Sequence, residues 1–282
     1  MITGYHAVYE NDFFEGIDNA STNGFEFVQF DLGIPKFYLD DLSIDDLIKI
    51  RDYAKEKEVV ITFHAPGDNV SLYCDYSLIR DGILKQFKMI IEKANILEAR
   101  HITMHAGAYP KFKKSGTKDD DFSLIYKDYY EDILYENLKE LIVSSNKTLI
   151  CLENYNFDTR TINVAKKLVN HSYSLFLTLD TAKMYSKKFE VDKEVFDFYK
   201  EYNYFVRELH IHDCNKRFGS HQIVGTGIVD FVLFKEFIQK DNTYINFEIR
   251  PLESATIAKE ILKQQLSENK KINNSPSSMT VN

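Results

Sequence analysis

The stretch LHIHDCNKRFGSHQIVGTG, residues 209–227, joins a short apolar run to alternating histidines, an acid and a loop punctuated by glycines. Successive side chains of a β-strand point to opposite faces, so His210 and His212 share one face of a strand that ends here. Such a strand brings metal-binding or proton-transferring groups to one edge of a sheet. Their role depends on what the other strands bring to the same edge.

Short β-rich runs alternate with longer amphipathic segments on both sides of this stretch. The β-rich runs are residues 5–9, 25–31, 59–64, 101–105, 148–153, 175–180, 206–213 and 244–248. The helical segments are residues 43–57, which open on Ser43 as a helix cap, 77–97, a long helix that ends near residue 145, 163–170, 193–204, 231–239 and 254–265. Repeated βα units without an interrupting linker predict an α/β fold of one domain, a single (β/α)8 barrel.

The two ends of the chain and its cysteines bear on the extent of the domain and on the cellular location of the protein. We expect the barrel to occupy residues 1–267 and the polar residues 268–282 to form a disordered C-terminal tail. The first residues are acidic where a secretory signal would be basic and apolar, and no apolar run reaches the roughly 18 residues that cross a bilayer. Three cysteines without C-x-x-C spacing make no disulfide framework. These features favour a cytoplasmic protein with no membrane partner, and they leave open whether it forms a homo-oligomer.

Charge argues against a nucleic-acid partner. The chain has 43 acidic and 35 basic residues and a net charge of −8, whereas a protein that binds many phosphates needs a basic surface. The lysine-rich residues 111–118 are interpreted as a solvated charge run, with a mobile lid over a ligand as the alternative. The GTG of residues 225–227 lacks the strand, spacing and helix of a nucleotide-binding loop.

Six of the predicted strands end on, or close to, a residue that can bind a metal or move a proton. These residues are His64, His105, Glu153, Asp180, His210 and Glu248. The carboxyl ends of all strands of a parallel barrel meet at one rim, so residues far apart in the sequence converge there. A shared site explains all six at once, whereas structural pairing would have to explain each one separately.

The carboxylates in this set predict a divalent cation. Carboxylates in contact repel each other by roughly 4 kcal/mol per pair at an effective dielectric constant near 20, and a bound cation removes that cost. Glu153, Asp180, His210 and Glu248 offer three oxygens and one nitrogen, a set suited to Mn, Mg or Co, with Zn as a further option. His64 and His105, if they share Glu153, form a set better suited to Zn or Fe.

The other histidines have less specific interpretations. We expect His6, His101 and His171 to be hydrogen-bonded structural residues, because most buried polar groups are simply paired. His212 lies on the same face as His210, so it either orients a metal-binding group or contacts substrate. No Ser or Cys lies in a nucleophile-elbow sequence.

At these residues the chain resembles the xylose isomerase-like TIM barrels, the superfamily of the sugar phosphate isomerases and epimerases and of endonuclease IV (AP endonuclease family 2). The resemblance covers nearly the whole barrel. Its motifs are HAP at His64, HAG at His105, LEN at Glu153, LD at Asp180, LHIHD at His210, H-x-x-V-G-x-G from His221, and FE at Glu248.

The resemblance implies a role for each matching position. Glu153, Asp180, His210 and Glu248 would bind the principal metal, and Glu153 and Glu248 would also act as the acid/base pair in the isomerase branch. His64 and His105 match a second-metal site of the endonuclease branch.

The chain departs from the endonuclease pattern at two positions. Lys183 stands where that branch has a histidine, and Gly219 stands where it has an aspartate. Of the third zinc site only His221 is left, because a lysine ammonium has no lone pair to offer a metal. His221 is therefore grouped with His64 and His105 as a possible ligand of a second metal. In the isomerase branch Lys183 and Lys216, together with His212, would instead contact substrate.

The leading hypothesis is a divalent-metal-dependent isomerase or epimerase of a small sugar, keto-sugar or polyol derivative. Glu153 or Glu248 would remove a proton next to a carbonyl and the other would return it, with an enediolate between the two steps. One alternative is an endonuclease IV-like metal-dependent phosphodiesterase. A second alternative is a di-iron or zinc enzyme that acts on a peptide or small molecule. The least favoured alternative is a non-enzymatic metal-binding scaffold.

Overall fold

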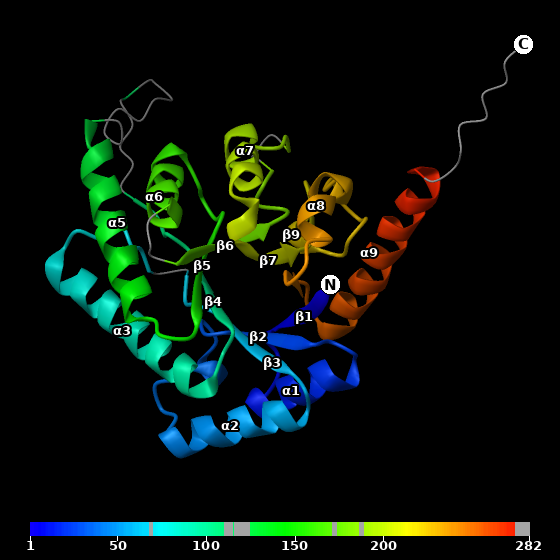
Figure 1. Cartoon of the computed structure of the whole chain (residues 1–282), viewed down its shortest axis with the longest axis horizontal. Coiled ribbons are helices and arrows are strands. Elements are labelled where there is room, and N and C mark those ends of the chain that lie inside the picture. The colour runs from blue at the N-terminus through cyan, green and yellow to red at the C-terminus, as the bar shows by residue number, and fades with distance from the viewer. Residues whose placement is uncertain (68–69, 110–114, 116–124, 171–173, 186–188, 274–282) are drawn as a thin grey trace, which may run out of the picture.

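The computed structural model describes residues 1–67, 70–109, 115, 125–170, 174–185 and 189–273. It contains a closed barrel of eight parallel strands in the order β1-β10-β7-β6-β5-β4-β3-β2, with helices around the outside (Figure 1). This confirms the predicted (β/α)8 barrel. The chain from β1 to the last helix is therefore one continuous barrel.

The strands and helices follow the predicted alternation closely. The barrel strands are β1 Ile2–Ala7, β2 Phe27–Asp31, β3 Val60–His64, β4 His101–Met104, β5 Leu149–Glu153, β6 Leu175–Asp180, β7 Val206–Ile211 and β10 Tyr244–Phe247. The helices are α1 Phe13–Thr22, α2 Ile44–Glu56, α3 Ser77–Leu97, α5 Lys127–Ser144, α6 Thr159–Asn170, α7 Lys193–Glu201, α8 Lys235–Ile238 and α9 Leu252–Asn273.

Local sequence explains where several elements begin. The Ser43 hydroxyl accepts a hydrogen bond from the Asp46 backbone N–H, and the Asp46 carboxylate accepts one from the Ser43 backbone N–H. This reciprocal capping box starts α2, as predicted from Ser43. The first strand begins earlier than the predicted residue 5, because the β-branched Ile2 and Thr3 already pair in parallel with β10.

The interior of the barrel is polar beneath the rim. Glu208 of β7 is fully buried and accepts hydrogen bonds from Gln29 of β2 and Thr103 of β4. Asn246 of β10 donates to Gln29. Barrels of this type are more often filled by branched apolar side chains, so the apolar core here lies mainly between the strands and the surrounding helices.

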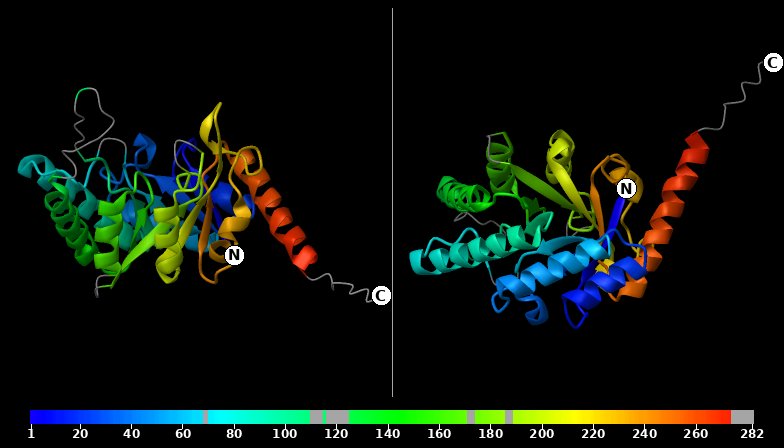
Figure 2. Two further views of the ribbon diagram at one scale, coloured as in Figure 1. Left: turned by 90° about the horizontal axis from the view of Figure 1, so that it is seen from above. Right: turned by 60° about the horizontal axis from the view of Figure 1, so that its bottom comes forward.

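Two features of the structure were not predicted. The residues after β7 form a small antiparallel hairpin, β8 Asp213–Asn215 and β9 Gly219–Gln222, which stands on one rim of the barrel (Figure 2). Helix α9 continues past residue 267, where the tail was expected, to Asn273. Residues 274–282 of that expected tail and the lysines of residues 111–118 lie outside the described residues.

Within the described ranges, every helix is too short or too polar to cross a bilayer.

Candidate metal centre

The four predicted principal ligands meet at the carboxyl ends of neighbouring strands. Glu153 ends β5, Asp180 ends β6, His210 lies in β7, and Glu248 follows β10. Asp180 and His210 are register partners. The Nδ1 atom of His210 lies 3.5 Å from Oε2 of Glu153 and 3.2 Å from Oε2 of Glu248. All four side chains are buried, with Glu248 the most exposed at 7%.

The ring of His210 is oriented by a buried carboxylate behind it. Its Nε2 lies 3.2 Å from Oε2 of Glu208, which accepts the ring N–H. Burial alone would raise the pKa of Glu208, but His101 and His210 hold it well below its usual range, so Glu208 stays an acceptor. The Nδ1 of His210, which faces the site, has no hydrogen-bond partner among the described residues. A metal-binding histidine shows this pattern, with one nitrogen anchored and the other free to coordinate.

The charges around His210 favour a cation. Burial lowers the pKa of His210, but the carboxylates of Glu208, Glu153 and Glu248 outweigh it and raise the pKa well above the ordinary value. Asp180, His210 and Glu248 can each place a ligand atom within 4.8 Å of the others. The donor set, the unsatisfied nitrogen and the electrostatics together fit a divalent metal.

Asp180 is held in place by backbone and by His212. Its Oδ1 accepts hydrogen bonds from the backbone N–H groups of Ala182 and Lys183, at 2.8 and 2.9 Å. Its Oδ2 lies 3.0 Å from Nε2 of His212, which is fully buried. Of the two predicted roles for His212, the structure favours the one in which it orients a metal-binding carboxylate.

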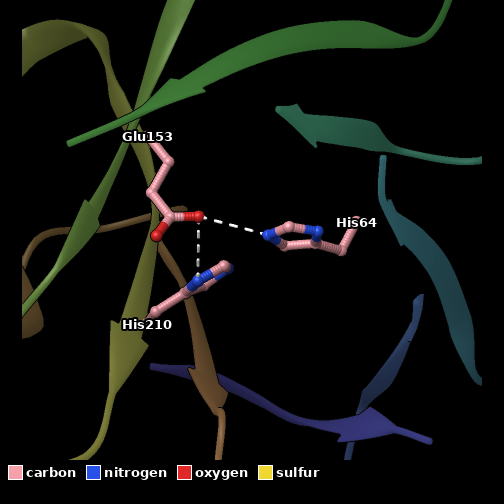
Figure 3. A group of neighbouring side chains, drawn as sticks. All are labelled: His64, Glu153 and His210. Atoms are coloured by element: carbon pink, nitrogen blue, oxygen red, sulfur yellow. Dashed lines mark hydrogen bonds and ion pairs between the residues drawn. The ribbon is translucent and has the colours of Figure 1, made fainter. Parts of the chain in front are cut away.

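The predicted second pair, His64 and His105, flanks Glu153 from the other side. Their Nε2 atoms lie 3.3 and 3.2 Å from Oε2 of Glu153. Figure 3 shows His64 and His210 pointing at the same Glu153 oxygen. Burial lowers the pKa of His64, but Glu153 and more distant acids raise it to about 9. In return, the pKa of Glu153, which burial would raise, is held well below its usual range by His105 and His210.

His221 joins a different group from the one expected. It lies with His212 and Glu248, and its ring centroid is 4.5 Å from that of His212. Its Nδ1 lies 3.1 Å from the Glu248 carbonyl oxygen. Burial and neighbouring cations lower its pKa to about 4, although Glu248 opposes them. His221 is therefore placed as a neutral imidazole beside Glu248, apart from the His64–His105 pair.

His6 is a site residue that the sequence analysis missed. Its Nδ1 lies 3.3 Å from Oε1 of Glu248, its Nε2 lies 3.4 Å from Asp31, and its ring stacks on His64. His6 was expected to be a structural residue, but β1 starts at Ile2 and places His6 near its carboxyl end, beside Glu248. His101 pairs with buried Glu208 as a structural residue, and His171 lies outside the described residues.

Two cavities open beside the centre. One, of about 480 Å³, is lined by His64 and His105 together with the acids Asp31 and Asp40. The other, of about 360 Å³, is lined by the predicted substrate-binding residues Lys183 and Lys216 together with asparagine and aromatic side chains. Space for a small molecule therefore lies at His64 and His105, which contact Glu153, and at Lys183, whose backbone N–H donates to Asp180.

The chain belongs to the xylose isomerase-like TIM barrel family, whose model matches residues 17–265. An uncharacterized protein of Methanocaldococcus jannaschii is 24% identical over 208 residues, which cover 71% of this chain and 74% of that protein. Among solved structures, a D-tagatose 3-epimerase-like protein is 20% identical, with a TM-score of 0.75 over 96% of this chain and all of that one.

Two other solved structures share the fold at lower identity. D-psicose 3-epimerase from Clostridium cellulolyticum H10, solved with D-tagatose, is 16% identical and has a TM-score of 0.72 over 94% of this chain and 99% of that one. The IOLI protein, solved with a zinc atom, is 16% identical and has the same TM-score over 95% of this chain and 99% of that one. At these low sequence identities, the structural similarities show that the chain shares the fold of these proteins and nothing more.

Proposed function

We propose that this protein is a divalent-metal-dependent isomerase or epimerase of a small sugar, keto-sugar or polyol derivative. The observation that supports it most is the Nδ1 of buried His210, which has no hydrogen-bond partner among the described residues and faces the carboxylates of Glu153 and Glu248. Asp180 can place a ligand atom near His210 and Glu248 as well. Glu153, Asp180, His210 and Glu248 would hold one Mn, Co or Mg ion, by the preference of these metals for oxygen-rich sites. Several structural neighbours, including D-psicose 3-epimerase, have names that fit this class.

The acid/base work falls to Glu153 and Glu248. The bound metal would polarise a carbonyl and the adjacent hydroxyl, which acidifies the hydrogen on the carbon between them. Oε2 of each carboxylate lies within 3.5 Å of the same His210 nitrogen, so a sugar carbon bound beside the cluster is within reach of both. One carboxylate removes the proton and the other returns it, which changes the configuration of that carbon. Lys183 and Lys216 contact the substrate from the second cavity.

Hydrogen exchange with solvent tests this proposal directly. The metal-loaded protein is incubated with D-tagatose or D-psicose in D₂O, and mass spectrometry and NMR follow deuterium at the carbons next to the carbonyl. We expect incorporation and epimer formation, both abolished in the variant Glu248→Gln. The matched control Glu236→Gln changes an exposed carboxylate of α8 and should leave the rate unchanged. Exchange that persists in Glu248→Gln would remove this residue from the mechanism.

A second candidate rests on His64 and His105, which share Glu153 and could hold another metal. A second metal held there would fit a phosphodiesterase resembling endonuclease IV, or a zinc or di-iron enzyme, better than a one-metal isomerase. Metal analysis of protein purified without added metal separates the two. About one Mn, Co or Mg per chain supports the isomerase. Two or more Zn or Fe per chain, or incision of DNA at abasic sites, supports the second candidate.

A further inference from the structure

The two cavities beside the metal cluster carry opposite charge. The cavity of about 480 Å³ contains the carboxylates of Asp31 and Asp40 and no lysine or arginine among its described lining residues. The cavity of about 360 Å³ contains the ammonium-bearing side chains of Lys183 and Lys216. The two cavities therefore present opposite charge to a ligand.

The two lysines come from different elements and converge on one space. Lys183 follows Asp180 at the end of β6, and Lys216 lies in the turn between β8 and β9. Each ammonium lies near an aromatic ring, Lys183 Nζ 5.6 Å from the centroid of Tyr155 and Lys216 Nζ 5.5 Å from that of Phe189. Each contact leaves the ammonium free to donate hydrogen bonds into the cavity.

Neither lysine is neutralised by a carboxylate partner in the part of the chain that the structure describes. No ion pair within 4.0 Å joins either ammonium to an acid there, whereas many surface lysines of the chain have one. Among the described residues that line the same cavity, Asp192 is the one acid, and its Oδ1 caps α7 by accepting from the Val195 backbone N–H. The two ammoniums therefore outweigh the single carboxylate among the described lining residues of this cavity.

We propose that the substrate carries an anionic group, a carboxylate or a phosphate, and that Lys183 and Lys216 bind this group in the 360 Å³ cavity. This inference rests on the proposed function, whose reacting carbons would lie at the metal cluster. Hydrogen bonds between an ammonium and an anion are about twice as strong as neutral ones, so the anion fixes which end of the sugar faces the metal. The acidic cavity on the other side repels the same group and reinforces that orientation.

Binding measurements with three sugars of one carbon skeleton test the proposal. D-fructose, D-fructose 6-phosphate and D-fructuronate differ only at the sixth carbon, which carries a hydroxyl, a phosphate or a carboxylate. Isothermal titration calorimetry with the full-length, Mg-loaded protein should give a Kd at least tenfold lower for one of the anionic sugars than for D-fructose. Which anion binds more tightly identifies the phosphate or the carboxylate as the natural group.

Lysine variants locate the effect. Lys216→Met changes an exposed side chain with no effect expected on the fold, and Lys183→Met changes a more buried one. Each should remove most of the preference for the anionic sugar over D-fructose, so that the ratio of the two Kd values falls toward one. Lys200→Met, on the exposed face of α7, is the matched control and should keep the full preference.

Three outcomes would overturn the proposal: equal affinity for all three sugars, failure of both anionic sugars to bind at millimolar concentration, or a preference that survives both substitutions. The last outcome would assign anion binding to the metal alone. Binding and turnover are read separately, so the proposals can fail separately. If neutral ketohexoses exchange hydrogen with solvent but the protein shows no preference for anionic sugars, only this inference is rejected. If the protein prefers anionic sugars but none of the sugars exchanges hydrogen, only the proposed isomerase function is rejected.

Discussion

At the scale of single residues, buried Glu208 explains the orientation of the His210 ring in the candidate metal centre. It is fully buried, accepts from Gln29 and Thr103, and lies 3.2 Å from Nε2 of His210 and 3.1 Å from Nε2 of His101. An ionised carboxylate can only accept, so it requires a hydrogen on Nε2 of His210 and leaves Nδ1 to face Glu153 and Glu248. The sequence alone does not reveal this role of Glu208, because nothing in the sequence distinguishes a buried glutamate in a strand from an exposed one.

The variant Glu208→Gln should weaken metal binding without removing a ligand. The amide places an N–H₂ group where the carboxylate accepted, so the hydrogen bond that orients His210 is weakened or lost. Losing such a supporting contact typically costs about 10- to 100-fold in metal affinity. Calorimetric titration with Mn or Co measures the change, with circular dichroism as a check of folding and Glu236→Gln as control. An unchanged metal affinity in folded protein would contradict this role of Glu208.

At the scale of elements, one side chain builds the hairpin and loop that follow β7. The Asp213 carboxylate accepts hydrogen bonds from the backbone N–H groups of Cys214, Gly225, Gly227 and Val229, at 2.8 to 3.0 Å. A Cβ on Gly227 would lie 2.1 Å from the Cys214 carbonyl oxygen, so only glycine fits there. The GTG of residues 225–227 is therefore part of a loop folded around an aspartate.

The variant Asp213→Asn should destabilise the protein by about 2 to 3 kcal/mol. The amide keeps one acceptor but turns an N–H₂ group toward backbone donors, and hydrogen bonds to a buried charged group contribute about 1.5 to 3 kcal/mol. Urea unfolding followed by circular dichroism measures the loss. The control Asp241→Asn, in an exposed loop, should change the free energy of unfolding by less than about 0.5 kcal/mol. Equal stabilities of the two variants would contradict this account of the loop.

The start of α2 offers a second test at this scale. Ser43→Ala removes the hydroxyl that accepts from the Asp46 backbone N–H and leaves that N–H without its cap. The expected loss is about 1 kcal/mol, the usual cost of deleting a serine cap. Urea unfolding measures it, and Ser21→Ala is the comparison, since that hydroxyl makes only a 3.5 Å contact with the Lys57 carbonyl. A loss no larger than that of Ser21→Ala would show that the cap contributes nothing.

The elements also show which features were predictable. β6 and α3 have their predicted bounds, because a continuous apolar run and a helical apolar spacing each identify one element unambiguously. The β8–β9 hairpin was missed because its two strands are short and polar. His6 was missed for a related reason: a strand placed three residues too late puts its end in the wrong position.

At the scale of the whole molecule, the metal centre joins one half of the barrel. Its proposed ligands come from β5, β6 and β7 and from the residue after β10, and these four strands are consecutive in the barrel. Strand-end residues were predictable as a group because a parallel barrel has one rim for all carboxyl ends. How these strand-end residues group into separate clusters was not predictable, since the grouping depends on side-chain directions that the local sequence does not encode.

Because the ligands converge only in the folded barrel, metal binding should stabilise the whole fold. A metal held 100-fold above its Kd adds about 2.7 kcal/mol to the free energy of unfolding. The urea midpoint should rise with added Mn, Co or Mg while the m-value stays constant, because the surface exposed on unfolding is unchanged. A chelator should reverse the rise. Glu248→Gln should shrink it, because one ligand charge is lost. A midpoint that does not move, in protein shown by metal analysis to hold the ion, would mean that these four strands do not form the binding site.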